Sequence, residues 1–227
     1  MTKFEPGNRA LKAAVGQWLA QEEYTDMPAE LRRLPARRLI NPLLSFLYDR
    51  QALVKWHAVT AIGRLVADLA DQNLESARVV MRRLMWNLND ESGGIGWGSP
   101  ECMGAIMAGH EQLAKEFHAI LISYLDPGKN FLEHEGLQPG VLWGAGRLAR
   151  SRPQYVAAAV PLLPPFLDSD NAAIRGHAAW AAMALGGPNL AVLLERLASD
   201  RQEIDLYRNQ RLERIAIGAI VQEKEIS

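Results

Sequence analysis

A helical segment that recurs every 35 to 42 residues is the feature that most restricts how this chain can fold. In residues 54–65 an apolar residue is followed by a cation, then by small residues one turn later, and by Gly63 nine positions after the start. Similar segments lie at 137–148 and 174–183, the second half recurs at 215–220, and residues 95–104 match loosely. The equivalent positions are Gly63, Gly104, Gly146, Met183 and Gly218, which are 41, 42, 37 and 35 residues apart. This period is that of a two-helix repeat in a solenoid.

A partner helix is expected before each recurring segment. The apolar patterning favours helices at 36–48, 74–88, 111–125, 153–167 and 189–198. Upstream, apolar residues form one helical stripe within residues 8–24. Alternation of apolar and polar residues is nearly absent, so we expect helices to carry the fold. We predict one all-α domain over residues 1–227, a right-handed α–α superhelix of about five helical pairs at 36–222 with an N-terminal cap at 1–35.

This pattern resembles the HEAT-like repeats of the armadillo/HEAT superfamily, including those of phycobilisome lyase subunits and of short bacterial scaffold proteins. The resemblance covers about residues 36–220. It implies the α-solenoid architecture and no particular function, because such solenoids bind peptides, proteins or nucleic acids and in some cases carry active sites.

Composition and charge narrow the classes of function. Apolar residues make up 48% of the 227 residues, which is enough for a continuous core. The 25 Lys and Arg against 26 Asp and Glu give a net charge of -1, so no global basic field draws the chain to nucleic acid or an anionic membrane. Residues 1–12 lack the apolar stretch of a signal peptide, and no apolar run reaches about 18 residues. With a single cysteine, Cys102, these features predict a cytoplasmic protein.

Two connections between paired helices are unusually long, at 89–100 and 126–136. Equivalent connections of successive repeats lie side by side on one edge of a solenoid, so we expect these two to meet. We call residues 91–100 and 128–136 the lip, and predict that it binds a partner. The candidate binding residues in and beside the lip are Glu91, Gly94, Trp97, Glu101, Lys129, Phe131, His134 and Glu135. In the alternative interpretation, Trp97 and Phe131 only fill a gap in the helix stack.

Other patterns do not support a cofactor or metal site. Residues 93–98 are rich in glycine, but they follow no strand and lack the Gly-Lys-Ser or Gly-Lys-Thr of a phosphate-binding loop. HEAT-like deoxyhypusine hydroxylases place His-Glu pairs early in their recurring helices. The pairs at those positions here are Trp56-His57, Pro139-Gly140 and Gly176-His177. We therefore predict no metal and no cofactor.

A nucleic-acid function would rest on the arginine clusters at 32–38 and 78–83 and on six tryptophans. HEAT-like alkylpurine DNA glycosylases are similar in length and use tryptophans with an aspartate on a basic concave face, but their catalytic residues have no match in this sequence. The near-neutral charge also argues against broad phosphate contact, so we expect no nucleic-acid partner.

The preferred interpretation is a non-catalytic scaffold or adaptor. It would bind a protein or peptide through the face of the second helix of each pair and through the lip. The alternative is a HEAT-like enzyme that acts on DNA bases, or a lyase or chaperone for a cofactor-bearing protein.

Overall fold

The computed structural model describes residues 6–89 and 95–223, and helices occupy most of them. The N-terminal cap holds α1 (Asn8–Leu19) and α2 (Ala29–Arg32). The first helices of the pairs are α3 (Ala36–Ser45), followed by the 3-10 turn η1 (Phe46–Tyr48), then α5 (Leu74–Asn89), α7 (Glu111–Ser123) and α11 (Pro188–Leu197). The second helices are α4 (Ala52–Gln72), α6 (Ser99–Gly109), α8 (Gln138–Ala149), α10 (Ala172–Leu185) and the short α12 (Ile217–Gln222).

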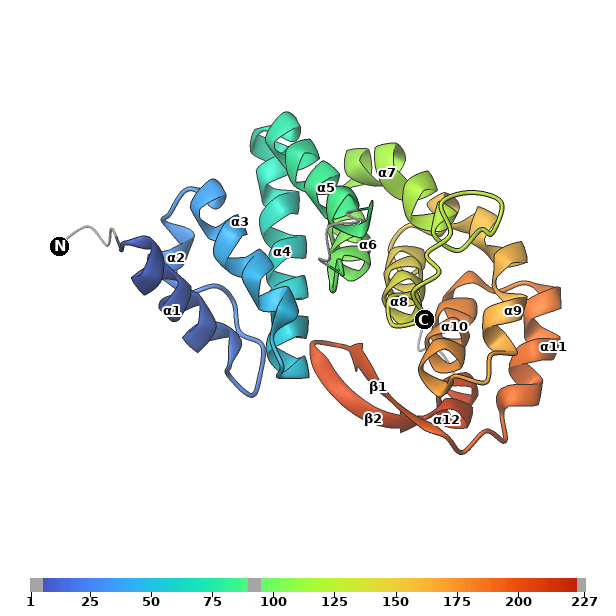
Figure 1. The fold of residues 1–227 in the computed structure, drawn as a ribbon. Helices are drawn as coiled ribbons and strands as arrows, with labels where there is room; N and C mark the ends of the chain where they lie inside the picture. The colour runs from blue at the N-terminus through green and yellow to red at the C-terminus, as the bar shows by residue number, and fades with distance from the viewer. Residues whose placement is uncertain (1–5, 90–94, 224–227) are drawn as a thin grey trace.

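The second helices stack on one another in sequence order. Helix α4 packs on α6, α6 on α8 and α8 on α10, and α12 contacts α10. Figure 1 shows this row as an arc, with α5 and α7 on one side of it and a pair of strands on the other. The predicted helical solenoid is therefore confirmed.

Small residues lie where the second helices come closest, as the repeat predicts. A Cβ atom built on Gly104 would lie 2.4 Å from the Cα atom of Gly144 in the next helix. A Cβ atom on Gly146 would lie 2.8 Å from the ring of Trp180. A larger side chain at either place would force the helices apart. The small residues predicted at positions 104 and 146 of the repeat therefore do lie at contacts between neighbouring second helices.

The continuous helix expected at 153–167 is wrong. The segment forms two 3-10 turns, η2 (Pro153–Tyr155) and η3 (Ala157–Leu162), followed by the four-residue α9 (Pro164–Leu167). Pro161, Pro164 and Pro165 lack backbone N–H groups, and their rings clash with the preceding helical turn. The prolines therefore divide the helix that the apolar pattern predicted.

The expectation that strands are absent is wrong near the C-terminus. Strands β1 (Glu203–Arg208) and β2 (Arg211–Ala216) form an antiparallel hairpin between α11 and α12. Its turn places Asn209 and Gln210 in the left-handed region, with φ of 50° and 63°, as a two-residue hairpin turn requires. The second helix of the fifth pair was predicted at 215–220. Because β2 ends at Ala216, this helix, α12, begins at Ile217.

The hairpin crosses the N-terminal halves of the second helices. Strand β1 contacts α10, and β2 reaches α4 at the other end of the row (Figure 1). The ring of Tyr207 stacks on Trp56, with centroids 5.0 Å apart, and its backbone oxygen accepts a 2.7 Å hydrogen bond from Trp143 Nε1. Its hydroxyl lies 2.9 Å from Thr60 Oγ1. The hairpin is thus fixed over one half of the face that the second helices share.

Candidate binding groove

A groove of about 1270 Å³ runs along the C-terminal halves of the second helices. The hairpin tip, residues 207–210, bounds it, together with Ile220 and Glu223 in and after α12. We call this hollow the groove. It occupies the part of the second-helix face that the hairpin leaves open.

The repeat sets which side chains face the groove. In four successive second helices, the residue directly after the recurring glycine or methionine position lines the groove. These residues are Arg64, Ala105, Arg147 and Ala184. Because equivalent positions of stacked helices align, these residues form a row across the groove. Two arginines in this row are separated by one alanine.

Two tryptophans give the groove a rigid aromatic wall. The rings of Trp143 and Trp180 stack with centroids 5.9 Å apart, and the two residues are only 4% and 5% exposed. The guanidinium of Arg150 lies 3.8 Å from the centroid of the Trp180 ring and donates hydrogen bonds to the backbone oxygens of Gly146 and Trp180. Arg150 therefore holds α8 against α10.

Cations outnumber acids in the groove lining, and their partners among the described residues differ. Arg208 binds Glu213 and Glu223, and Arg64 pairs with Asp26 at 2.7 Å in a largely exposed contact. Half-buried Arg147 donates a 2.9 Å hydrogen bond to Ser151 Oγ.

No carboxylate among the described residues forms an ion pair with Arg147. Burial lowers the pKa of its guanidinium, and the nearby charge of Arg64 lowers it further. Arginine nevertheless stays charged. The groove therefore contains a positive charge that no acidic side chain in the described part of the chain neutralises.

Glu101, one of the predicted binding residues, lies buried within the helix stack and not on an exposed surface. It is only 4% exposed, and its Oε1 accepts a 2.7 Å hydrogen bond from Lys55 Nζ. Its Oε2 lies against Gly140 and has no hydrogen-bond partner among the described residues. This burial depends on the close approach of α6 and α8, which no local feature of the sequence indicates.

The two long connections meet, as predicted from the stacking of repeats. The rings of Trp97 and His134 lie edge to face, with centroids 5.4 Å apart. Trp97 packs partly against the core, whereas His134 is exposed. Phe131 also packs against the core, and its ring lies 6.4 Å from that of Phe166. Both aromatic residues of the lip therefore help to close the helix stack.

The remaining lip candidates are not gathered into one site. Lys129 is exposed and pairs with Asp126 at 3.2 Å, and Glu135 is exposed. Glu91 and Gly94 lie outside the described residues. None of the described lip candidates lines the groove, because the lip precedes α6 and α8 whereas the groove lies along their C-terminal halves.

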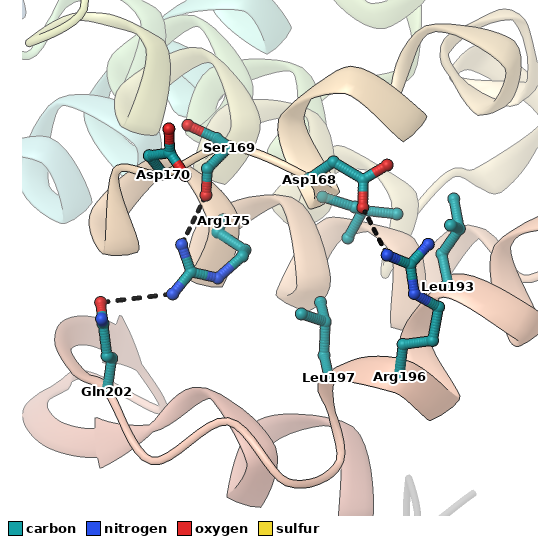
Figure 2. Close-up of a pocket in the computed structure, with 9 residues that line it drawn as sticks. Asp168, Ser169, Asp170, Arg175, Leu193, Arg196, Leu197 and Gln202 are labelled. Carbon is teal, nitrogen blue, oxygen red and sulfur yellow. Dashed lines mark hydrogen bonds and ion pairs between the residues drawn. The ribbon is translucent and has the colours of Figure 1, made fainter.

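A smaller pocket of about 370 Å³ lies between α9, α10 and α11. Figure 2 shows Arg175 within it, bonded to the backbone oxygen of Ser169 and to Gln202. Arg175 also pairs with Asp200 at 2.8 Å, and Asp168 pairs with Arg196 at 3.4 Å. These contacts tie neighbouring elements together and leave the arginines neutralised.

Within residues 6–89 and 95–223, no group of three or more His, Cys, Asp or Glu side chains is placed to hold a metal ion. In the same described part of the chain, no helix combines the length and the apolar character that a membrane span needs.

Two of the residues that line the groove share a local sequence pattern. Arg64 and Arg147 both stand in the triplet Gly-Arg-Leu, at 63–65 and 146–148. The glycine faces the neighbouring helix, and the next residue faces the groove. A charged residue that recurs beside a contact glycine thus indicated which side chains share one face, but not that this face stays open.

No family model matches the chain. An uncharacterized protein of Archaeoglobus fulgidus is 25% identical over 182 residues, which cover 80% of this chain and 92% of that protein.

Among solved structures, similarity is to designed armadillo-repeat proteins. One, in complex with the peptide (KR)4, has a TM-score of 0.54 at 19% identity and covers 86% of this chain and 85% of its own. Another has a TM-score of 0.53 at 17% identity and covers 96% and 93%. At such identities the likeness concerns the fold alone.

Proposed function

Because the chain has the armadillo/HEAT-type helical-repeat fold, we propose that it is a scaffold that binds an extended segment of a partner protein along the groove. The observation that carries this proposal is the row of equivalent side chains that faces the groove from four successive repeats. A repeated row suits a ligand that is itself repetitive, such as an extended backbone.

The size of the groove supports a peptide ligand. Its volume of about 1270 Å³ exceeds the roughly 300–1,000 Å³ of small-molecule sites. Its wall is rigid, because Trp143 and Trp180 are buried and stacked. A preformed wall lowers the entropy cost of binding. The structurally similar designed protein that holds the peptide (KR)4 supports the same class of ligand.

The lip is a separate candidate surface in this proposal. His134, Lys129 and Glu135 are exposed there, but a partner would reach them only beyond the N-terminal ends of α6 and α8. We therefore assign the main contact to the groove and a secondary contact to the lip.

A block placed in the groove tests the proposal. Asp68 is exposed on α4 and lines the groove, so Asp68→Trp would fill it without disturbing the core. Peptides selected from a random displayed library on the unchanged protein should bind this variant at least about tenfold more weakly.

Glu195→Trp is the matched control, because Glu195 is an exposed acid on α11 outside the groove. It should keep the full affinity. The proposal fails if selection yields no binding peptide, or if Asp68→Trp and Glu195→Trp bind the selected peptides equally well.

A further inference from the structure

The charges in the groove define the chemistry of its ligand. Its lining contains four arginines, Arg64, Arg147, Arg150 and Arg208, against two acids, Asp68 and Glu223. Glu223 is already bound to Arg208. Leaving Arg150 aside, the lining still holds Arg64 and Arg147 against Asp68 and is positive, although the whole chain has a net charge of -1.

Arg147 is the centre of this positive surface. It is half-buried, and its described contacts include Ser151 Oγ but no carboxylate. The charge of Arg64 acts on it from the same row, and the partner of Arg64, Asp26, is 78% exposed. Exposed ion pairs are weak and exchange readily. An incoming carboxylate would thus find one unneutralised guanidinium and one that is easily recruited.

We propose that the groove binds an acidic segment of a partner protein, with Arg147 and Arg64 holding carboxylates of that segment. The inference rests on the proposed function and adds the charge of the ligand. The proposed ligand is acidic, whereas the peptide (KR)4 bound by the structurally similar designed protein is basic. Arg64 and Arg147 lie on either side of Ala105 in the row, so they would engage two acidic side chains of the segment.

The geometry favours a peptide over nucleic acid. Trp143 and Trp180 are 4% and 5% exposed, so their faces are not available to stack on bases. The hairpin tip, residues 207–210, narrows one side of the groove. Arg208 is neutralised within the fold, which leaves few cations for a run of phosphates.

Fluorescence anisotropy with labelled synthetic peptides tests the inference on the full chain. The probes are an alternating Asp-Glu octapeptide, (KR)4 and a neutral Gly-Ser octapeptide, with short duplex DNA as a fourth probe. We expect the acidic peptide to bind at least about tenfold more tightly than the other three. Its affinity should fall as salt is added, because exposed charges are screened.

Three variants localise the effect. Arg147→Gln should weaken binding of the acidic peptide at least about tenfold. Arg64→Gln should weaken it too, and it should cost little in folding because the ion pair of Arg64 with Asp26 is largely exposed. Arg50→Gln is the matched control, since Arg50 is exposed and lies outside the groove. It should bind like the unchanged protein. Thermal unfolding followed by circular dichroism verifies that each variant is folded.

Each result decides between the two proposals. If selected library peptides bind in the groove but the acidic probe binds no better than (KR)4 or the neutral peptide, the charge inference is wrong and the peptide-binding function stands. The same holds if both Arg147→Gln and Arg64→Gln keep full affinity for the acidic probe. If duplex DNA binds most tightly and Arg147→Gln abolishes that binding, both proposals are overturned.

Discussion

The two halves of the second helices differ in what covers them. Over the N-terminal halves, the hairpin buries Trp56 under Tyr207, and the Lys55–Glu101 ion pair lies at that end of the stack. Along the C-terminal halves the same helices present Arg64 and Arg147 to the groove. One repeated helix is therefore covered at one end and faces an open groove at the other. The hairpin between α11 and α12 decides which end is covered.

The largest expected effect tests the covered half. Trp56→Ala removes a side chain that is 7% exposed, stacks on Tyr207 and makes a tilted ring contact with Trp143. We expect it to lower the free energy of unfolding by about 3–5 kcal/mol, measured by urea denaturation. Trp86→Ala is the control, because Trp86 is 73% exposed on α5 and should change stability by less than about 0.5 kcal/mol. Equal losses of stability from the two substitutions would contradict the conclusion that packing under the hairpin stabilises the fold.

Close packing between the second helices should give the next largest effect. Gly146→Leu places a side chain against Trp180 and the backbone of Ala181, with would-be Cβ distances of 2.8 and 3.0 Å. We expect a loss of about 1–3 kcal/mol in the free energy of unfolding. Gly7→Leu, where a Cβ meets nothing within 4 Å, should be nearly neutral. A Gly146→Leu variant with unchanged unfolding would contradict the register.

Two buried histidines should make stability depend on pH. Burial is the main cause that lowers the pKa values of His57 and His177 below the ordinary 6.5. As the pH falls below 6.5, the unfolded chain binds protons that the folded chain excludes, so the free energy of unfolding decreases. The slope is at most about 1.4 kcal/mol per pH unit for each histidine.

Urea denaturation at about pH 7, 6 and 5 measures this slope, and His177→Gln should reduce it. Carboxylates affect stability only at lower pH. Hydrogen bonds from Arg78 and Gln112 lower the pKa of Glu116 to about 2, so the stability that ionised Glu116 contributes is lost only as the pH falls below the ordinary 4.5. Stability that stays constant from pH 7 to 5 would show that the two histidines are not held neutral.

The lip should give the smallest effect. His134 is exposed, so His134→Ala should change the free energy of unfolding by less than about 0.5 kcal/mol. Trp97→Ala should cost more, because Trp97 packs against the core and its ring lies beside Gly136. Thermal denaturation of the two variants compares them directly. A larger loss from His134→Ala would mean that the lip is held together differently.

The site was harder to predict from the sequence than the fold. The lip was found through its length, and the stacking rule correctly brought Trp97 and His134 together. The same reasoning misplaced Glu101, because a loop-edge position in the sequence becomes a buried one once Gly140 of α8 packs against it. Arg64 and Arg147 were visible only as a repeated triplet, and nothing local indicated that the face beside them stays open.

The hairpin was missed for a related reason. In β1, Ile204 and Leu206 are buried while Glu203 and Asp205 are exposed, but this alternation spans only a few residues. Such a short pattern is weak beside the long helical repeats around it. The hairpin is stabilised mainly from outside, by its packing on Trp56, Trp143 and α10.

The sequence by itself determined the helical pairs, their period and the contact glycines, because helix formation and close helix packing leave a local record in residue type every turn and every repeat. Only the tertiary structure decided which half of the second-helix face is open. That choice depends on contacts such as Thr60 with Tyr207, which are 147 residues apart. Such contacts leave no periodic pattern in the sequence, because each is made only once and between residues that are far apart in the chain.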